Sequence, residues 1–460
     1  MAAGSTVADV HTASREPGTR EPGTEKLTVH QLLRRGAAAY VKENRGDAAT
    51  MTVQSVLAKI SMCRTSALGG RWYECDDCGE TTKLYNSCGD RHCPGCSGAK
   101  RVDFNDRASK LITPGVDHYQ VIFTVPEIVS TLALANRSEI ADLLFKSAWR
   151  AIKKTVTAEQ GYDPAALMVL HTWNQKLEPH WHVNALVPGA GPATDGDGVN
   201  ESVSPRGDGK AYLVDAINLR RTYRAVFLRG LKSLYRRGKL SFGGSVEHLR
   251  SQDEWDMLMD ELSQQEWVSH IEPPPSELSE ADHVVSYMTR YLTGGPISDH
   301  RILSADDREV TLLARAGRRT GGSREQVPMK LSTSEFVRRW CLHIQPHQLT
   351  KTRCFGGWSN SRREAYLAKM QSAFDMIGGS PVEEPSAEMI DSAASLCCEH
   401  CGGESLTLIG QERKPSWSVL LRLDSQCSPG GTRRVKNWKK NGYGTLRWVR
   451  VFTLGTSRTY

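Results

Sequence analysis

Two tyrosines four residues apart, Tyr287 and Tyr291, are the first candidates for chemistry in this sequence. The segment 280–292 is predicted to be a helix, because Ser279 and Asp282 fit a capping box at its start. A separation of four places both side chains on one helix face, with their Cβ atoms about 5–6 Å apart. A tyrosine hydroxyl can attack phosphate and form a covalent intermediate. Two aromatic residues at this spacing are, however, usually part of an ordinary helix core.

Two histidines, His180 and His182, are the second candidates, because they alternate with Trp181 on a predicted strand. Side chains at positions i and i+2 of a strand point to the same face, so both imidazoles and Asn184 share one side. Two imidazoles on a rigid strand could hold a divalent ion, Mg²⁺ or Mn²⁺, that polarises a phosphate. His171 could reach the same face from the preceding strand. The competing interpretation is a pair of histidines on a solvated or satisfied sheet face.

Cysteines provide a third candidate site, which would be structural rather than catalytic. Two CxxC pairs, Cys75 with Cys78 and Cys93 with Cys96, lie fourteen residues apart. Each pair offers two thiolates from one tight turn, and two pairs complete the tetrahedron that Zn²⁺ prefers. We therefore predict one structural zinc held by these four cysteines, against the alternative of reduced thiols without metal. Further possible ligands are Cys63, Cys88 and His92.

A third CxxC pair, Cys398 and Cys401, lies near the C-terminal end and amounts to half a site. Cys397 or His400 could assist it. The chain holds 12 cysteines, and clustering at this spacing in a reducing compartment favours metal over disulfides.

The elements that would position these residues are strands and one strongly basic helix. Strands are predicted at 119–125, 166–172 and 180–187, with the last two joined by a turn. Apolar residues at helical spacing predict a helix between Leu219 and Leu234 that carries no acidic residue. Its basic residues are Arg220, Arg221, Arg224, Arg229, Lys232 and Arg236. They fit a face that contacts DNA phosphates, although a solvated helix face explains them equally well.

Composition limits the possibilities further. A chain of 460 residues suggests two to four domains, and 39% hydrophobic with 24% charged residues is typical of globular proteins. No stretch approaches eighteen consecutive apolar residues, and no basic-then-apolar leader is present, so we expect a cytoplasmic protein without a membrane partner. The net charge of +7 permits a nucleic-acid partner without requiring one.

Taken together, the motifs resemble the two-tyrosine HUH transposases of bacterial rolling-circle insertion sequences, of the insertion-sequence ninety-one type. The resemblance covers residues from about 30 to 360 in family order. The matching stretches are Asn86–Cys96, Val121–Pro126, His171–Leu177 running into His180–His182, Leu186–Gly189, Tyr287–Leu292, Ile297–Ile302 and Glu335–Arg339.

The resemblance implies an α+β protein, in which a small zinc-binding domain for DNA precedes an HUH endonuclease domain with a central antiparallel sheet flanked by helices. The expected division is a disordered tail at 1–25, a helical and zinc-binding domain at 26–105 and the nuclease at 106–365. A linker and basic region at 366–460 completes it. The disordered tail is also indicated by the tandem repeat REPGT.

The resemblance also implies a function. The expected enzyme nicks and joins DNA strands through tyrosine, with Tyr287 and Tyr291 as nucleophiles and a catalytic Mg²⁺ or Mn²⁺. Its expected partners are single-stranded DNA at element ends and target DNA, in association with the bacterial nucleoid. Family members often carry three alternating histidines on the metal strand, whereas this chain has Asn184 in the third position. The metal pair is therefore either His180 with His182, or His182 with Asn184.

Two other functions fit the same motifs. A plasmid rolling-circle replication initiator or relaxase would share the nuclease chemistry, although the upstream zinc module favours a transposase. A zinc-dependent DNA-binding protein with an inactive nuclease domain is the second alternative, and Asn184 is the residue that keeps it open.

Overall fold

The structure, a computed structural model, describes residues 27–43, 50–274, 295–315, 325–375 and 397–425. The expected disordered tail, residues 376–396 and 426–460 of the expected linker and basic region, and the tyrosine helix at 280–292 lie outside these ranges. The described elements mix helices with antiparallel sheets, so the α+β class predicted from the sequence is confirmed.

The largest sheet has five strands, each antiparallel to its neighbours, in the order β12-β4-β5-β3-β8. The strands are β3 (His118–Thr124), β4 (Ala165–Trp173), β5 (Pro179–Pro188), β8 (Val268–Glu272) and β12 (Thr352–Gly356). The three strands predicted at 119–125, 166–172 and 180–187 are confirmed to within one residue at each end. A tight turn joins β4 to β5, as the sequence predicts.

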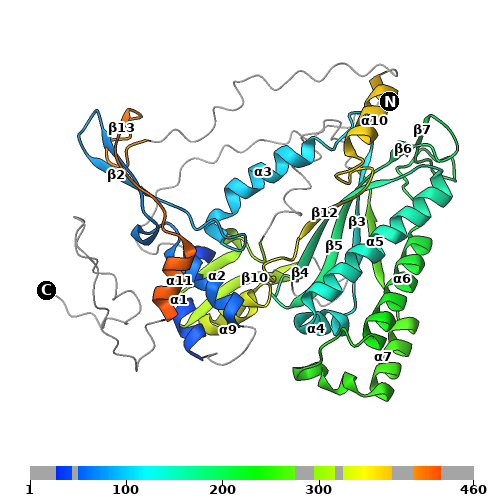
Figure 1. Cartoon of the computed structure of the whole chain (residues 1–460), viewed down its shortest axis with the longest axis horizontal. Coiled ribbons are helices and arrows are strands. Elements are labelled where there is room, and N and C mark those ends of the chain that lie inside the picture. Colours follow the sequence, from blue (N-terminus) through cyan, green and yellow to red (C-terminus); the bar gives the residue numbers. More distant parts are fainter. Residues whose placement is uncertain (1–26, 44–49, 275–294, 316–324, 376–396, 426–460) are drawn as a thin grey trace, which may run out of the picture.

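Helices cover one face of this sheet (Figure 1). They are α4 (Glu127–Ala135), α5 (Arg137–Gln160), α6 (Ala216–Arg236) and α7 (Gln252–Gln264). Alternate strand residues such as Phe123, Trp181 and Met168 point into this layer and are fully or almost fully buried. The opposite strand positions therefore face away from these helices, and they include the histidines.

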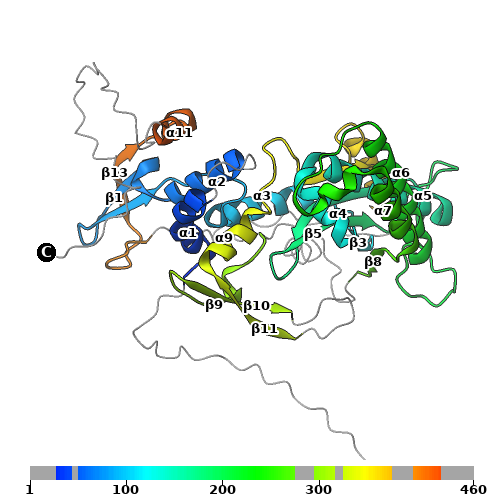
Figure 2. The same cartoon turned by 90° about the horizontal axis from the view of Figure 1, so that it is seen from below.

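Apolar side chains cover only one end of the second face of the sheet. Leu167 and Leu186 meet side chains of α3 (Ser97–Ser109), α10 (Arg363–Asp375) and the loop before α10. Figures 1 and 2 both show α3 running between the N-terminal helices and this sheet. The other end of the same face carries polar residues. One end of this face thus packs against apolar side chains, and the other end holds the candidate site residues.

The N-terminal part begins with α1 (Val29–Glu43) and α2 (Thr50–Met62), followed by η1 (Ser66–Leu68). A hairpin of β1 (Gly70–Cys75) and β2 (Thr81–Tyr85) comes next, and then η2 (Pro94–Cys96). β13 (Leu406–Glu412) pairs with β1 to make a three-stranded sheet, and α11 (Trp417–Ser425) follows it. A segment more than 300 residues away in sequence thus completes the N-terminal sheet, as Figure 2 shows.

A third sheet packs against the same N-terminal helices. It consists of β9 (Ile302–Ala305), β10 (Glu309–Arg315) and β11 (Gln326–Ser332), flanked by η4 (Asp299–Arg301) and α9 (Thr333–Cys341). Ser332 caps α9 by accepting a hydrogen bond from the backbone N–H of Glu335. Side chains of α1, α2, β10 and α9 form one hydrophobic cluster. The described residues between Ile297 and Ile344 therefore share a core with described residues between Leu27 and Cys96, although the sequence analysis expects them in the nuclease domain.

Two short elements remain among the described residues. A hairpin of β6 (Ala190–Pro192) and β7 (Val199–Glu201) follows β5. One more 3-10 helix, η3 (Gly244–Arg250), precedes α7. Within the described ranges, every helix is too short or too polar to serve as a membrane span.

Candidate active site and metal centres

The three histidines singled out in the sequence come together on the sheet face that the helices α4–α7 leave free. His171 on β4 is the direct antiparallel partner of His182 on β5. The ring centroids of these two lie 5.2 Å apart, and the His180 and His182 rings are also 5.2 Å apart. The strand register therefore places His171 beside His182 across the hairpin, as the sequence predicts.

Hydrogen bonding fixes the tautomer of His182. Its Nδ1 lies 3.1 Å from the backbone carbonyl oxygen of His180, which can only accept, so Nδ1 carries the proton. Nε2 is then left with a lone pair. Burial, reinforced by the charges of His171 and His180, lowers the pKa of His182 well below its usual value, and burial likewise lowers the pKa of His180. Both rings are thus neutral near pH 7, the form in which imidazole binds metal.

Asn184 is held by hydrogen bonds on both sides, and it is 3% exposed. Its Oδ1 accepts from Nε2 of Gln120 at 3.0 Å, and its Nδ2 lies 3.1 Å from Nδ1 of His171. Both amide groups can be turned over together without losing either contact, which reverses the direction of both bonds. In the reversed form Nδ1 of His171 donates, and its Nε2 carries the lone pair. The structure therefore places Asn184 beside His171 as an orienting group.

These side chains fit a divalent ion in their chemistry and spacing. A metal ion about 2.1 Å from a ring nitrogen lies about 3.2 Å from the centroid of that ring. Two imidazoles that bind the same ion, with an angle of about 90–110° between them at the metal, therefore have centroids about 4.5–5.2 Å apart. The measured 5.2 Å agrees with this range. Among the described residues, only two cysteine groups already bring their ligand atoms within 4.8 Å of one another. The histidine rings would therefore turn slightly to hold an ion.

Two polar residues of the same face were missed by the sequence analysis. Ile122 pairs with Asn184 on one side and with His270 of β8 on the other, so His270 shares the face of the histidine cluster. Its Nε2 lies 2.7 Å from a carboxylate oxygen of Glu272, two residues further along the strand. The alternation in Val268–Glu272 could have predicted a strand, but its short length and single apolar interior residue give a weak pattern.

The tyrosines Tyr287 and Tyr291 lie outside the described residues, so their predicted helix and their distance from the histidines stay predictions. The described residues on either side of their segment are both fixed near the histidine sheet. Glu272 ends the edge strand β8. Arg301, on the other side, donates to the carbonyl oxygen of Gln175 in the turn between β4 and β5.

The cysteines predicted to share one zinc belong to two different groups, which corrects the predicted grouping. Cys93 and Cys96 join Cys63 and Cys88 in a cluster of four buried side chains. Within it, Sγ of Cys96 lies 3.6 Å from Sγ of Cys63 and 3.6 Å from Sγ of Cys88. Backbone N–H groups of Cys88 and Asp90 donate to Cys63 and Cys88 sulfurs, a typical arrangement around thiolate ligands.

The second pair, Cys75 and Cys78, lies instead beside Cys398 and Cys401. The half site near the C-terminal end is thus completed by the N-terminal hairpin. The sequence analysis paired the two CxxC motifs that are nearest in sequence, because a contact between cysteines 320 residues apart leaves no local sequence pattern. Cys397 is exposed and lies outside the group, as does His400.

Comparison with known proteins supports the assignment of both parts. Residues 165–365 match the family model Y2_Tnp, described as "Putative transposase". Residues 32–125 match Zn_Tnp_IS91, described as "Transposase zinc-binding domain". A protein of Sinorhizobium fredii named "Putative transposase y4qJ" is 30% identical over 359 residues, which cover 77% of this chain and 86% of that protein. The chain belongs to this transposase family. No solved structure matches it.

The zinc-binding family match and the cysteine geometry together support structural zinc in the transposase. The match ends at residue 125, so it covers Cys63, Cys75, Cys78, Cys88, Cys93 and Cys96 but neither C-terminal cysteine. The first cluster, Cys63–Cys88–Cys93–Cys96, lies wholly within it. This cluster is therefore the one to which the family's zinc is most directly assigned.

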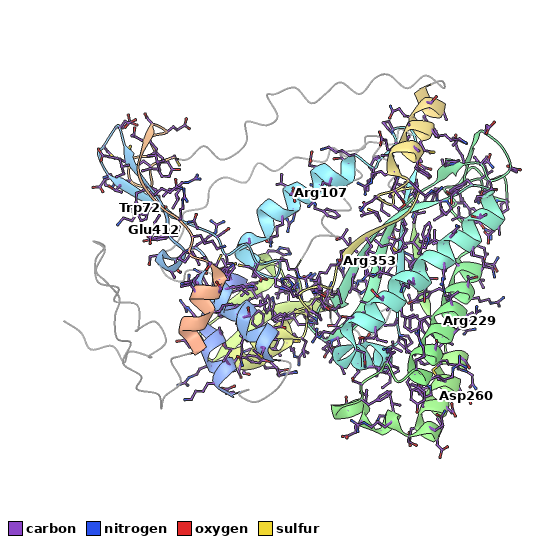
Figure 3. The ribbon with its side chains drawn as sticks, in the orientation of Figure 1. Trp72, Arg107, Arg229, Asp260, Arg353 and Glu412 are labelled. Atoms are coloured by element: carbon purple, nitrogen blue, oxygen red, sulfur yellow. The ribbon has the colours of Figure 1, made fainter. Side chains whose placement is uncertain are left out.

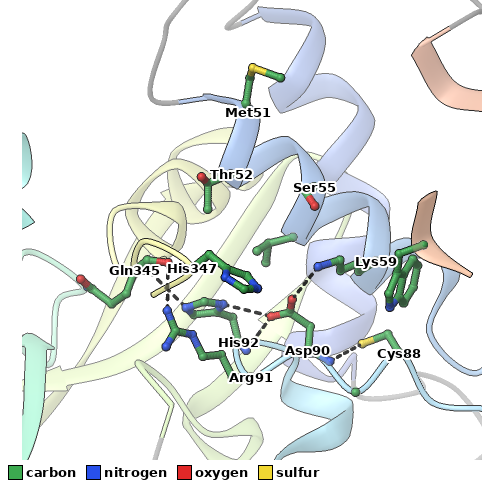
Figure 4. Close-up of a pocket in the computed structure, with 13 residues that line it drawn as sticks. Met51, Thr52, Ser55, Lys59, Cys88, Asp90, Arg91, His92, Gln345 and His347 are labelled. Atoms are coloured by element: carbon green, nitrogen blue, oxygen red, sulfur yellow. Dashed lines mark hydrogen bonds and ion pairs between the residues drawn. The ribbon is translucent and has the colours of Figure 1, made fainter. Parts of the chain in front are cut away.

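His92, a further possible zinc ligand in the sequence, instead links the zinc loop to the loop 345–349, which lies within the Y2_Tnp match (Figure 4). Its Nε2 accepts from the backbone N–H of Gln345, and its Nδ1 donates to the Asp90 carboxylate, which also pairs with Lys59. Burial lowers the pKa of His92 to about 4, so the ring is neutral. The neighbouring Arg91 donates to carbonyl oxygens at Leu349, Gln345 and Pro346.

The basic helix of the transposase is α6, and its arginines have two different roles. Arg224 donates to the carbonyl oxygen of Gln265 at 3.1 Å, and Arg220 lies 3.9 Å from Glu266. The exposed basic residues form a stripe opposite the buried side of the helix; they are Arg221, Arg229, Lys232 and Arg236. Figure 3 shows Arg229 at the outer edge of the molecule, near Asp260 of α7. The stripe thus faces away from the sheet and its histidines, and its contact with DNA stays a prediction.

Proposed function

We propose that this transposase nicks and rejoins single DNA strands through 5′-phosphotyrosine intermediates in rolling-circle transposition. The observation that supports this most strongly is the convergence of His171, His180 and His182 on one sheet face. Three imidazoles from two paired strands suit a divalent ion, and they lie on the sheet face opposite the main apolar core.

In this proposal, His180 and His182 hold the catalytic Mg²⁺ or Mn²⁺, with His171 as a third ligand from β4. The ion supplies a Lewis acid that polarises the scissile phosphate. Asn184 and Gln120 set which nitrogen of His171 faces the ion. The alternative metal pair of His182 with Asn184 is disfavoured, because the Asn184 amide is buried and already uses both of its polar atoms.

The nucleophiles are Tyr287 and Tyr291. The hydroxyl oxygen of one tyrosine bonds to the phosphorus, the bond from phosphorus to the 3′ oxygen breaks, and the strand ends in a free 3′-hydroxyl. A 3′-hydroxyl at the joining site later attacks the phosphotyrosine and releases the tyrosine. Because one phosphodiester is exchanged for another, no external energy source is required. A second tyrosine can cut again while the first still holds a DNA end.

The proposed substrates are single-stranded DNA at the element ends and a target DNA. A single strand is favoured because the reacting phosphate has to reach histidines whose side chains are half-buried or buried. The N-terminal zinc module is proposed to provide DNA binding, which the family description alone does not specify.

A nicking assay tests the proposal. Purified chain is incubated with a 5′-labelled or 3′-labelled oligonucleotide from the element end, with Mn²⁺ or Mg²⁺. We expect a free 3′-hydroxyl on one product and protein covalently attached to the 5′ end of the other. Tyr287→Phe with Tyr291→Phe should abolish the adduct, and His180→Ala or His182→Ala should abolish nicking.

His248→Ala is the matched control, since His248 is exposed on η3 and distant in sequence from the cluster. It should nick at the normal rate. An adduct that persists in the double tyrosine variant would show that another residue is the nucleophile. Full nicking by His180→Ala would overturn the metal assignment.

A further inference from the structure

We propose that Cys75, Cys78, Cys398 and Cys401 form a second structural zinc site, which joins the two ends of the chain. This inference is independent of the DNA chemistry proposed above. It concerns a ligand pair, Cys398 and Cys401, that lies outside the matched zinc-binding domain. Both cysteine pairs belong to described residues, and all four sulfur atoms lie within 4.8 Å of one another.

The sulfur spacing indicates a metal rather than disulfides. Sγ of Cys75 lies 3.6 Å from Sγ of Cys401, and Sγ of Cys78 lies 3.7 Å from Sγ of Cys398. Four sulfurs at about 2.3 Å from a tetrahedral Zn²⁺ are about 3.8 Å apart. A disulfide would require about 2.05 Å. The four sulfur atoms are therefore spaced like the ligands of a tetrahedral zinc ion, and none of the four cysteines forms a disulfide.

The two knuckles have the same backbone design. In each, the glycine that follows the second cysteine has a positive φ, 72° at Gly79 and 77° at Gly402. That glycine donates its N–H to the carbonyl oxygen of the first cysteine, at 2.8 Å for Cys75 and 2.9 Å for Cys398. The backbone N–H of the first cysteine in each knuckle donates in turn to the carbonyl oxygen of the residue five positions later. Two copies of one ligand-presenting turn thus face each other.

Contacts beyond the cysteines hold the knuckles together. The Asp76 carboxylate accepts hydrogen bonds from the hydroxyls of Ser405 and Thr407, which lowers its pKa. Strands β1 and β13 pair from Gly70 with Glu412 to Cys75 with Leu406, directly next to the site. A side chain at Gly403 would meet the end of the exposed Asp77 side chain, which would have to move aside. The hydrogen bonds of Asp76 and the pairing of β1 with β13 thus hold the two knuckles beside each other.

The site would fasten the C-terminal segment to the first cysteine cluster. Lys414, two residues after β13, donates to the carbonyl oxygens of Ser87 and Cys88 at 3.0 and 2.7 Å. Its ammonium also lies over the Trp417 ring at 4.8 Å, as does that of Lys59 at 5.5 Å. A zinc-bound second knuckle would keep β13 and α11 in place against the loop that carries Cys88.

Zinc content of the purified full chain tests the site. We expect two zinc ions per chain, falling twofold to one in Cys398→Ser/Cys401→Ser and also to one in Cys63→Ser/Cys88→Ser. Cys397→Ser is the matched control, because this exposed cysteine is adjacent in sequence but outside the group, and it should keep both ions. One zinc in the unmodified chain, unchanged in Cys398→Ser/Cys401→Ser, would overturn the proposal.

A second measurement guards against variants that fail to fold. The unmodified chain is loaded with Co²⁺, whose thiolate absorption reports sulfur ligands directly. Two four-cysteine sites predict twice the absorption per chain of the Cys398→Ser/Cys401→Ser variant, with the same band positions. Absorption per chain that equals a single four-cysteine site would contradict the second site whatever the variants do.

Discussion

At the level of single residues, the catalytic proposal depends on which nitrogen of each histidine carries its proton. The backbone carbonyl of His180 fixes the proton of His182 on Nδ1, whereas the amides of Asn184 and Gln120 hold Nδ1 of His171 in place. Metal ligands of this kind are oriented by such partners, and loss of the partner commonly lowers metal affinity 10–100-fold. Asn184, in the third position of the strand, is therefore a residue to test.

Asn184→Ala should weaken Mn²⁺ binding about 10–100-fold and lower nicking at subsaturating Mn²⁺, with partial recovery at high Mn²⁺. The reason is that His171 loses the group that holds its ring, while Gln120 loses a buried partner. Calorimetric titration with Mn²⁺ measures the affinity. Asn218→Ala, at an exposed position of α6, is the control and should bind normally. Unchanged affinity in a folded Asn184→Ala chain would exclude an orienting role.

His92 predicts how stability depends on pH. Its pKa is lowered from 6.5 to about 4 by burial, so between these values the unfolded chain binds more protons than the folded chain. The free energy of unfolding therefore falls as pH falls through this window, by about 2 kcal/mol for this residue between pH 7 and pH 5. His118 and His343, whose pKa values are lowered to about 4 and about 3 by burial, act in the same direction.

Urea unfolding at pH 7 and pH 5 measures this dependence. His92→Gln keeps hydrogen-bonding groups near Asp90 and Gln345 but cannot titrate, so its stability should depend less steeply on pH. Because acid also protonates zinc-bound thiolates, the difference between the two proteins is the quantity that reports His92. Identical pH dependence in both proteins would contradict this prediction.

At the level of elements, the sequence predicted local structure well and long-range partners poorly. The strands β3, β4 and β5 follow from short apolar runs bounded by turn residues, and the face shared by His180, His182 and His171 follows from strand geometry and one turn. The partner of Cys75 and Cys78 could not be predicted, because β13 lies more than 300 residues away. His270 was missed because β8 is an edge strand with little burial to give a pattern.

The basic helix α6 shows the same limit. Helical periodicity predicted its buried side correctly, since Leu219, Tyr223, Phe227 and Leu231 are all buried. Periodicity could not show that its exposed arginines face away from the histidines. A DNA contact there would therefore involve parts of a long DNA that lie beyond the cleaved phosphate.

Replacing Arg221, Arg229 and Arg236 with Ala should weaken binding of long DNA and reduce its salt dependence, without changing nicking of a short saturating oligonucleotide. The slope of log K against log salt should fall by roughly 0.9 for each lost phosphate contact in duplex DNA. Binding isotherms at several salt concentrations measure it. Lys146→Ala, Arg150→Ala and Lys153→Ala remove equal charge from exposed positions of α5. Equal weakening by both sets would indicate net charge rather than an α6 contact.

At the level of the whole molecule, the parts of the chain that match the zinc-binding and transposase family models are interlocked. The core of α1 and α2 includes side chains from β9, β10 and α9, which follow the tyrosine segment in sequence. In addition, Arg91 and His92 of the zinc loop hold the loop 345–349. That loop continues from His343, which lies 3.2 Å from the Thr172 hydroxyl, next to His171.

This connection predicts that structural zinc affects catalysis at a distance. Zinc is removed with a thiol-reactive mercurial and a chelator, the reagent is reversed with excess thiol, and Mn²⁺ is restored to saturation. Nicking should then fall at least about tenfold, because the loop that carries Arg91 is no longer fixed by four sulfur ligands and no longer holds the loop 345–349. A displacement of about 1 Å near reacting groups can lower the rate about 100-fold.

Adding zinc back should restore activity. Arg91→Ala should show a similar loss while keeping its zinc, which separates the mechanical link from the metal itself. Normal nicking by a folded, zinc-free chain would show that the two parts work independently.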